Sequence, residues 1–306
     1  MTRVRWGAAL AVMVPLLLVV GCSTPEPPLL HPAGTGTDRY VALGDSWVSG
    51  PLIGVPVGDP VGCGRSANNY PHLVAHELDV KEFVDASCGS ANTSHLTERQ
   101  KDNLGTFAPP QFNALTEGTT LVTIGIGGND VKFDSLATSC INILPFPLGR
   151  APFGQPCVDR YVKNGVDEVS RRIATTRTKV DAALAGIRAR APRAEVVVTG
   201  YMAPFPDQGD GCWPRVPLLP RDTAYLRAKF KELNQMLADA SAAAGATFVD
   251  LYTPSIGHDL CADYQVAWIN GLAIDPAGIP LHPNEIGHAN VAPIVAAAAA
   301  RALAGP

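Results

Sequence analysis

Short apolar runs recur along the chain and alternate with longer stretches of helix-forming sequence. The runs, which predict β-strands, cover residues 39–43, 81–85, 120–126, 195–199 and 247–250. The longer stretches, which predict α-helices, cover residues 69–78, 158–191, 221–244 and 284–304. Apolar runs separated by helices are typical of a parallel sheet that is buried on both faces. The pattern therefore predicts an α/β fold, an open three-layer α/β/α sandwich with a central parallel sheet.

Residues 1–22 have the pattern of an export signal peptide. Arg3 and Arg5 provide a basic start, and the apolar run that follows is too short to span a bilayer comfortably. The sequence LVVGC at residues 18–22 also resembles a bacterial lipobox, whose cysteine is lipidated and becomes the new N-terminus. Lipidation of Cys22 would anchor the protein at the outer face of the cytoplasmic membrane. The alternative, a signal peptide that is simply cleaved, would give a secreted protein.

The rest of the chain predicts a tether and one domain. Residues 23–37 are rich in proline, glycine and threonine and lack periodicity, which predicts a flexible tether. No internal repeat interrupts residues 38–306, and the apolar content of 46% and charged content of 17% are those of an ordinary globular protein. The net charge is −4 without a basic cluster, which argues against nucleic acid as a partner. We expect a monomer.

The cysteine count favours disulfides over a metal site. Seven cysteines are present, and no CxxC spacing occurs. Setting Cys22 aside leaves an even set of six, which an oxidising compartment can pair completely. Six cysteines allow 15 pairings, so the count alone leaves the connectivity open. The six are Cys63, Cys88, Cys140, Cys157, Cys212 and Cys261.

A Gly-Asp-Ser sequence ending at Ser46 lies directly after the first predicted strand and before a predicted helix start. Sites in open parallel sheets form at the carboxyl ends of the strands, so the position of Ser46 is that of a functional residue. Its backbone N–H lies near a helix N-terminus, which favours developing negative charge. The alternative is that Asp45 and Ser46 only cap a helix.

Two further segments follow predicted strands in the same way. Residues 125–130, GIGGND, follow the third strand, where the glycines allow close backbone approach and Asn129 can direct a side-chain N–H at a ligand. Their spacing does not fit the dinucleotide fingerprint GxGxxG. Residues 87–90, SCGS, follow the second strand, where Gly89 can offer a backbone N–H or simply form a turn.

The sequence HPNEIGH at residues 282–288 precedes the last predicted helix. Pro283 restricts His282 to an extended conformation, which holds an imidazole at a loop–helix junction. The alternative is that His282 is only a solvated loop residue. Metal binding together with His288 is another, but a spacing of six does not suit one helix face, and no HExxH motif is present. His72 and His76 are four apart on a predicted helix but lack a third ligand, so we expect no metal site.

Taken in order, these blocks resemble the GDSL/SGNH hydrolases, a family named for its Ser, Gly, Asn and His residues. The matching positions are Ser46, Gly89, Asn129 and His282. Residues 63–71 and the HPNEIGH ending are also similar to secreted actinobacterial esterases and lipases. The resemblance implies the flavodoxin-like fold of that family and no cofactor. It also implies disulfides between sequential neighbours: Cys63–Cys88, Cys140–Cys157 and Cys212–Cys261.

The resemblance assigns roles as well. Ser46 would be the nucleophile and His282 the general base, with an oxyanion hole made by the N–H groups of Ser46 and Gly89 and the Asn129 amide. Asp45 is expected to tie the turn. The family commonly has an aspartate three residues before the histidine, and this chain has Ile279 there.

Two groups can take over the orientation of His282. A backbone carbonyl near Ile279 or Pro280 is the first, because some of the resembled esterases use one. The carboxylate of Asp275, the nearest upstream acid, is the second.

These residues lead to three candidate functions. The first is a carboxylesterase or lipase that acts on small-molecule or lipid esters, and the second is a deacylase of cell-envelope glycans or glycolipids. The third is a non-catalytic envelope lipoprotein, against which the complete set of four residues weighs. Proline-rich stretches at residues 143–148 and 213–220 either line an acyl groove or are only stiff loops.

Overall fold

A central parallel sheet organises the protein in the computed structural model, which describes residues 37–144, 153–272 and 278–305. The sheet has five strands in the order β2-β1-β5-β8-β9, and every neighbouring pair is parallel. Each strand begins and ends within one residue of its prediction. The strands are β1 (Arg39–Gly44), β2 (Glu82–Asp85), β5 (Leu121–Gly125), β8 (Glu195–Thr199) and β9 (Thr247–Val249).

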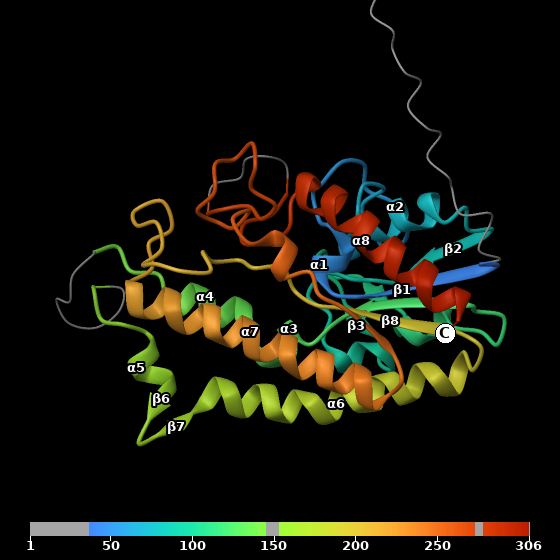
Figure 1. Ribbon diagram of the computed structural model, residues 1–306, viewed down its shortest axis with the longest axis horizontal. Coiled ribbons are helices and arrows are strands. Elements are labelled where there is room, and N and C mark those ends of the chain that lie inside the picture. The colour runs from blue at the N-terminus through green and yellow to red at the C-terminus, as the bar shows by residue number, and fades with distance from the viewer. Residues whose placement is uncertain (1–36, 145–152, 273–277, 306) are drawn as a thin grey trace, which may run out of the picture. The chain divides into compact units, whose positions relative to one another are not determined.

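Helices cover both faces of this sheet, which confirms the predicted three-layer architecture (Figure 1). Helices α2 and α8 pack together on one face, and α8 also contacts β8 and β9. Helices α6 and α7 pack together on the other, where α7 contacts the same two strands. The bounds are α2 (Tyr70–Glu77), α6 (Glu168–Arg190), α7 (Pro220–Ala243) and α8 (Glu285–Ala304). Because both faces are covered, residues 40–43 of β1 are completely buried.

The remaining elements are short and connect these layers. The α-helices are α1 (Ser46–Ser49), α3 (Gly128–Val131), α4 (Phe133–Ser139) and α5 (Val158–Tyr161). The 3₁₀ helices are η1 (Val61–Cys63), η2 (Thr93–Leu96), η3 (Gln111–Ala114) and η4 (Thr253–Ser255). Strands β3 (Gln100–Lys101) and β4 (Phe107–Ala108) form a small antiparallel pair.

The predicted helix over residues 158–191 is wrong in its first part. Helix α5 ends at Tyr161, and β6 (Val162–Lys163) then pairs with β7 (Val166–Asp167) in a hairpin. The two residues between them, Asn164 and Gly165, both have left-handed backbones, with φ of 52° and 76°. An Asn-Gly pair is the preferred two-residue hairpin turn, and it interrupts the helix that the flanking residues favour.

Helix α8 is long and apolar enough to cross a membrane by length and composition alone. Its contacts with α2, β8 and β9 are those of a core helix. Its start is fixed by Asn284, whose side-chain oxygen accepts the Gly287 N–H at 2.9 Å. This cap places the end of the preceding loop, and with it His282, at one defined position.

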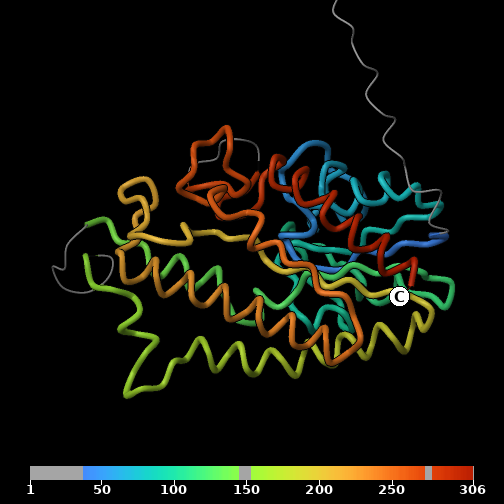
Figure 2. The backbone as a smooth tube through the Cα atoms, viewed as in Figure 1, coloured from blue at the N-terminus to red at the C-terminus, as the bar shows by residue number. Residues whose placement is uncertain are grey.

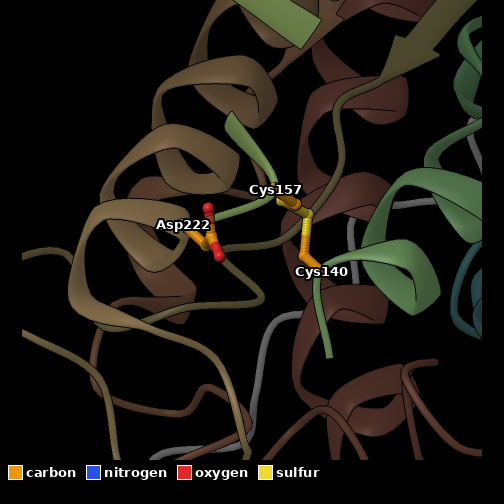
Figure 3. Close-up of side chains that lie close together, drawn as sticks. All are labelled: Cys140, Cys157 and Asp222. Carbon is orange, nitrogen blue, oxygen red and sulfur yellow. A yellow bond between two sulfur atoms is a disulfide. The ribbon is translucent and has the colours of Figure 1, made fainter. Parts of the chain in front are cut away.

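All three implied disulfides are present: Cys63–Cys88, Cys140–Cys157 and Cys212–Cys261. The second lies beside the buried carboxylate of Asp222 (Figure 3), and the three groups are within 4.8 Å of one another. Both sulfurs are bonded to each other, so no thiolate is available to bind a metal ion there. Burial raises the pKa of Asp222, and its carboxylate accepts the Val158 N–H at 3.0 Å.

Candidate active site

Ser46 lies in a tight turn at the carboxyl end of β1. Gly44 ends the strand with a φ of 152°, and a Cβ there would lie 2.6 Å from the carbonyl oxygen of Gly125 on the neighbouring strand. Asp45 then caps α1, because its Oδ1 accepts the Trp47 N–H at 2.9 Å. Ser46 is therefore the first residue of a short helix that begins directly at the sheet edge.

His282 lies next to Ser46 although 236 residues separate the two in sequence. The Ser46 Oγ and His282 Nε2 atoms are 2.8 Å apart. In Figure 2 the segment between β9 and α8, drawn orange to red, lies at the same end of the sheet as the turn after β1. The convergence of these two segments, expected from the sequence pattern, is present in the structure.

The other nitrogen of the His282 ring meets a backbone carbonyl. His282 Nδ1 is 2.9 Å from the Pro280 oxygen. A carbonyl only accepts, so Nδ1 carries the proton and Nε2 presents its lone pair to the Ser46 hydroxyl. The Ile279 carbonyl instead accepts a bond from the Asn270 side chain at 3.4 Å. Asp275 lies outside the described residues.

Backbone hydrogen bonds hold the His282 loop in place. The Asn270 N–H donates to the His282 oxygen at 2.8 Å, and the Leu281 N–H donates to the Asn270 oxygen at 3.0 Å. Leu281 has a φ of 62°, which is an unfavourable conformation for a leucine. The reversal at Leu281 lets the Pro280 carbonyl reach back to the histidine ring two residues later.

The environment keeps His282 neutral. Burial lowers the pKa of its imidazole below the ordinary value, while the Pro280 carbonyl and the charge of Asp134 partly oppose this shift. A neutral imidazole with Nε2 unprotonated is the form that can accept a proton from Ser46.

Asn129 is held at the same edge of the sheet. It lies in α3, and its Nδ2 donates to the Ala91 carbonyl at 2.8 Å. The amide has two N–H groups, and this bond uses one of them. Asn129 lines the same cleft as Ser46 and His282, so the second N–H is available on that side.

Gly89 departs from the sequence-based expectation. Its N–H donates to the Cys63 carbonyl at 2.8 Å, and Gly89 is absent from the lining of the cleft. The next residue, Ser90, lines the cleft and has a left-handed backbone with φ 65°. No acceptor among the described residues takes the Ser90 N–H. The Gly89 N–H, which was expected to be an oxyanion donor, is therefore bonded to another part of the protein.

The cleft itself has a volume of about 380 Å³. Its polar lining residues include Asp45, Ser46, Ser90, Asn103, Asn129, Asp134, Thr138 and His282. No lysine or arginine of the described residues lines it. Its apolar walls include Trp47, Phe133, Phe205, Phe230, Leu260 and Leu281.

These walls differ from the expected proline-rich stretches. None of residues 213–220 lines the cleft, and Leu218 and Leu219 are buried in the core instead. Of residues 143–148, only the first two are described. Pro204 and Phe205 supply the wall after β8. The rule that sites form after parallel strands could have found them, because they follow the fourth predicted strand.

Two further histidines of the described residues bond protein groups. His288 is completely buried, and its Nδ1 accepts the Tyr70 N–H at 3.0 Å. His72 Nδ1 instead bonds the Asn69 side chain at 2.8 Å. Within the described ranges, no cluster offers a metal ion a full set of free ligands.

Comparison with known proteins identifies the class. A family model described as the GDSL-like Lipase/Acylhydrolase family matches residues 42–289. The chain therefore belongs to the GDSL-like lipase/acylhydrolase family. This membership confirms the family resemblance and the expectation of an ester-hydrolysing enzyme.

Individual relatives agree with this assignment. Lipase 2 of Streptomyces coelicolor is 38% identical over 84% of this chain and 84% of its own length. A lipase of Streptomyces rimosus is 29% identical over 92% of both. The crystal structure of the extracellular lipase from Streptomyces rimosus superposes with a TM-score of 0.65 at 28% identity, covering 85% of this chain and 99% of that one. These similarities confirm the fold of the family.

Proposed function

We propose that the protein is an exported serine hydrolase of carboxylic esters, with Ser46 as nucleophile and His282 as general base. One observation carries the proposal: Ser46 Oγ lies 2.8 Å from His282 Nε2, while the opposite ring nitrogen is held by the Pro280 carbonyl at 2.9 Å. This arrangement fixes the tautomer that can deprotonate the serine.

The reaction follows from this geometry in two halves. His282 Nε2 takes the hydroxyl proton as Ser46 Oγ attacks the ester carbonyl carbon, and a tetrahedral oxyanion forms. The imidazolium then gives that proton to the leaving alcohol as the carbon–oxygen bond breaks, which leaves an acyl-Ser46 ester. Water, deprotonated by the same nitrogen, attacks the acyl group and restores the serine.

The oxyanion is assigned three donors. They are the Ser46 N–H at the start of α1, the free Nδ2 hydrogen of Asn129 and the Ser90 N–H, which replaces the N–H of Gly89. The absence of another acceptor for the Ser90 N–H and its place in the cleft wall support this assignment. Each such donor contributes about 3–4 kcal/mol, or about 10²–10³ in turnover.

The apolar walls favour an acyl ester over a sugar ester as substrate. A hydrocarbon chain gains about 0.8 kcal/mol for each buried methylene, and the aromatic wall residues offer that burial. Acetylated glycans would present hydroxyl groups to the same wall without partners. Relatives described as lipases support the same substrate class.

A serine-reactive phosphonate tests the nucleophile. We expect one label on the wild type and none on Ser46→Ala. Ser49→Ala is the matched control, because Ser49 lies in the same short helix, is buried and has an unpartnered Oγ among the described atoms. A label retained by Ser46→Ala would remove Ser46 from its role.

A panel of nitrophenyl esters from acetate to palmitate, extended with acetylated sugars, tests the reaction. We expect hydrolysis of the acyl esters, with longer chains preferred over acetate. Faster turnover of acetylated sugars would make the protein a glycan deacylase. Hydrolysis of neither group would leave a non-catalytic role.

Export is the second part of the proposal. The three disulfides support an oxidising compartment, and similarity to an extracellular lipase supports it too. Lipidation of Cys22 rests on the LVVGC sequence alone. We expect a clickable fatty acid to label the wild type and not Cys22→Ser, with the variant moving to the medium. A wild type without label would leave a simple cleaved signal.

A further inference from the structure

A buried tyrosine hydroxyl lies between two of the three turns that carry the proposed oxyanion donors. Tyr201 follows β8 and is 4% exposed. Its hydroxyl donates to Asp45 Oδ2 at 2.6 Å and accepts the Gly128 N–H at 2.8 Å. Asp45 directly precedes Ser46, and Gly128 directly precedes Asn129. One oxygen atom therefore joins the turn after β1 to the turn after β5.

The Asp45 carboxylate extends this connection into α1. Its second oxygen, Oδ1, accepts the Trp47 N–H at 2.9 Å. The path from Trp47 through Asp45 and Tyr201 to Gly128 consists of three hydrogen bonds, all measured between 2.6 and 2.9 Å. Ser46 directly follows Asp45, and Asn129 directly follows Gly128. Both proposed donors therefore lie next to a residue that these hydrogen bonds hold in place.

Tyr201 is itself fixed from behind. Its backbone N–H donates to Asn234 Oδ1, and its carbonyl accepts from Asn234 Nδ2, both at 2.8 Å. The Trp47 ring packs edge-on against the Tyr201 ring with centroids 5.3 Å apart. Gly128 lets the hydroxyl approach, because a Cβ there would lie only 3.0 Å from it. These contacts leave the hydroxyl little freedom to move away from the two turns.

The Tyr201 hydroxyl also stabilises the charged form of the buried Asp45 carboxylate. Burial raises the pKa of Asp45 to about 7, and the hydrogen bond from Tyr201 opposes that rise. No lysine or arginine of the described residues forms an ion pair with Asp45, and its carboxylate oxygens accept hydrogen bonds from the Tyr201 hydroxyl and the Trp47 N–H. Burial and the neighbouring carboxylate raise the pKa of Tyr201, which keeps the phenol protonated as a donor.

We propose that Tyr201 is a positioning residue that sets the distance and orientation between the Ser46 turn and the Asn129 amide, so that the oxyanion donors are in place before substrate binds. This inference rests on the proposed function. Preorganised donors are worth more than mobile ones, and a displacement of about 1 Å can cost about 10²-fold in rate. The alternative is a hydrogen bond that only stabilises the fold.

Tyr201→Phe removes the hydroxyl and keeps the ring. We expect kcat per phosphonate-titrated site to fall about 10–100-fold with KM changed less than about 3-fold, because the donors act on the transition state. Tyr40→Phe is the matched control. Tyr40 is also completely buried in the sheet, and its hydroxyl bonds Thr123 Oγ1 at 2.7 Å, away from the cleft. It should lose similar thermal stability and keep its kcat.

Asp45→Asn breaks the connection from the other side and serves if Tyr201→Phe does not fold. We expect a comparable loss of kcat. The kcat of the double variant should lie within about 3-fold of that of the slower single variant, because both changes cut the same connection. The Tyr201→Phe defect should also deepen as the pH falls, because the Asp45 pKa rises once its donor is gone.

An unchanged kcat in Tyr201→Phe, with thermal stability lowered as in Tyr40→Phe, would overturn the proposal. Additive losses in the double variant would do the same. Failure of the proposed function is a separate outcome, because the wild type would then lack the phosphonate label at Ser46. Titrating the label in every variant keeps the two outcomes apart.

Discussion

The proposed nucleophile and the proposed base are held in the site by different means. Ser46 lies at the end of a buried strand, in a turn tied by the side chains of Asp45 and Tyr201. His282 lies in an irregular loop, tied by the backbone of Pro280 and Asn270. The side chains of Asp45 and Tyr201 hold the first group, whereas the second is held mainly by main-chain groups together with the side-chain cap of Asn284.

This difference explains which residues the site requires. A turn tied by side chains needs particular residue types, so the Gly-Asp-Ser sequence is recognisable. A loop tied by its backbone needs a shape, and that shape is provided by the cap at Asn284 and the reversal at Leu281. The family commonly has an aspartate at position 279, and here the Pro280 carbonyl occupies the ring nitrogen that such a residue would bind, which supports our proposal that a carbonyl orients the ring.

The largest expected effect comes from removing His282, the proposed general base that is held by the loop. We expect His282→Ala to lower kcat/KM by about 10²–10⁴-fold, the range of general base catalysis. The matched control is His76→Ala, which removes an exposed histidine from α2. Rates are measured with a nitrophenyl ester at pH 8. A loss below about 10-fold would mean that another group deprotonates Ser46.

The next prediction concerns the side that carries the oxyanion donors. We expect Asn129→Ala to lower kcat by about 10²–10³-fold with little change in KM, because the amide acts on the developing oxyanion. Asn103→Ala, which changes another asparagine in the lining of the cleft, is the control and should change kcat less than about 5-fold. Equal losses in the two variants would point to general disruption of this wall.

The sheet and most helices could be predicted because burial on both faces leaves long apolar runs in the sequence. The predicted helix over residues 158–191 failed where Asn164 and Gly165 impose a turn, a local signal that periodicity does not register. The small hairpin of β3 and β4 was also missed, because strands of two residues are too short for any pattern.

The site shows the same limit. Ser46, His282 and Asn129 could be identified because their residue types follow strands or precede a helix. Gly89 was expected as a donor from the family resemblance, but the sequence does not reveal that its N–H bonds the Cys63 carbonyl or that Ser90 adopts a left-handed backbone. Tyr201 was missed although it follows a strand, since a tyrosine there has no distinctive chemistry until its hydroxyl is seen between Asp45 and Gly128.

His288 extends the comparison to stability, because it belongs to the same HPNEIGH motif as His282 yet lies in the core. Burial lowers the pKa of His288 to about 3, below the ordinary value of 6.5. The unfolded chain therefore binds more protons, and the stability that the neutral ring provides is present above pH 6.5 and lost as the pH falls toward 3. We expect the free energy of unfolding to fall by about 1 kcal/mol per pH unit below 6.5.

Urea unfolding between pH 7.5 and 5 measures this loss. His288→Gln should be less stable at pH 7.5 but flatter with pH, since its amide oxygen can still accept the Tyr70 N–H and does not titrate. His76→Gln, at an exposed position, should keep the slope of the wild type. A wild-type slope retained by His288→Gln would assign the acid sensitivity to other groups.

The smallest expected effect is that of removing the carboxylate of Asp134. This measurement distinguishes a carboxylate that only lies near His282 from one that orients its ring. The charge of Asp134 raises the pKa of His282, against the larger lowering by burial. Asp134→Asn should therefore move the acidic limb of kcat/KM below pH 6.5 to lower pH by a few tenths of a unit. Asp134 is exposed, so 0.5 M salt should remove most of that shift. Activity at pH 8 should stay unchanged, because the ring is neutral there in both proteins.

Asp275→Asn is measured alongside Asp134→Asn, because it tests whether a carboxylate orients the His282 ring. With the Pro280 carbonyl on His282 Nδ1, this second substitution should change kcat at pH 8 less than about 3-fold. A carboxylate that oriented the ring would behave differently, since its removal frees the imidazole to turn and destabilises the imidazolium of the transition state. A loss of about 10-fold or more in Asp275→Asn would therefore show that the base is held by a side chain after all, and the contrast between the two halves of the site would disappear.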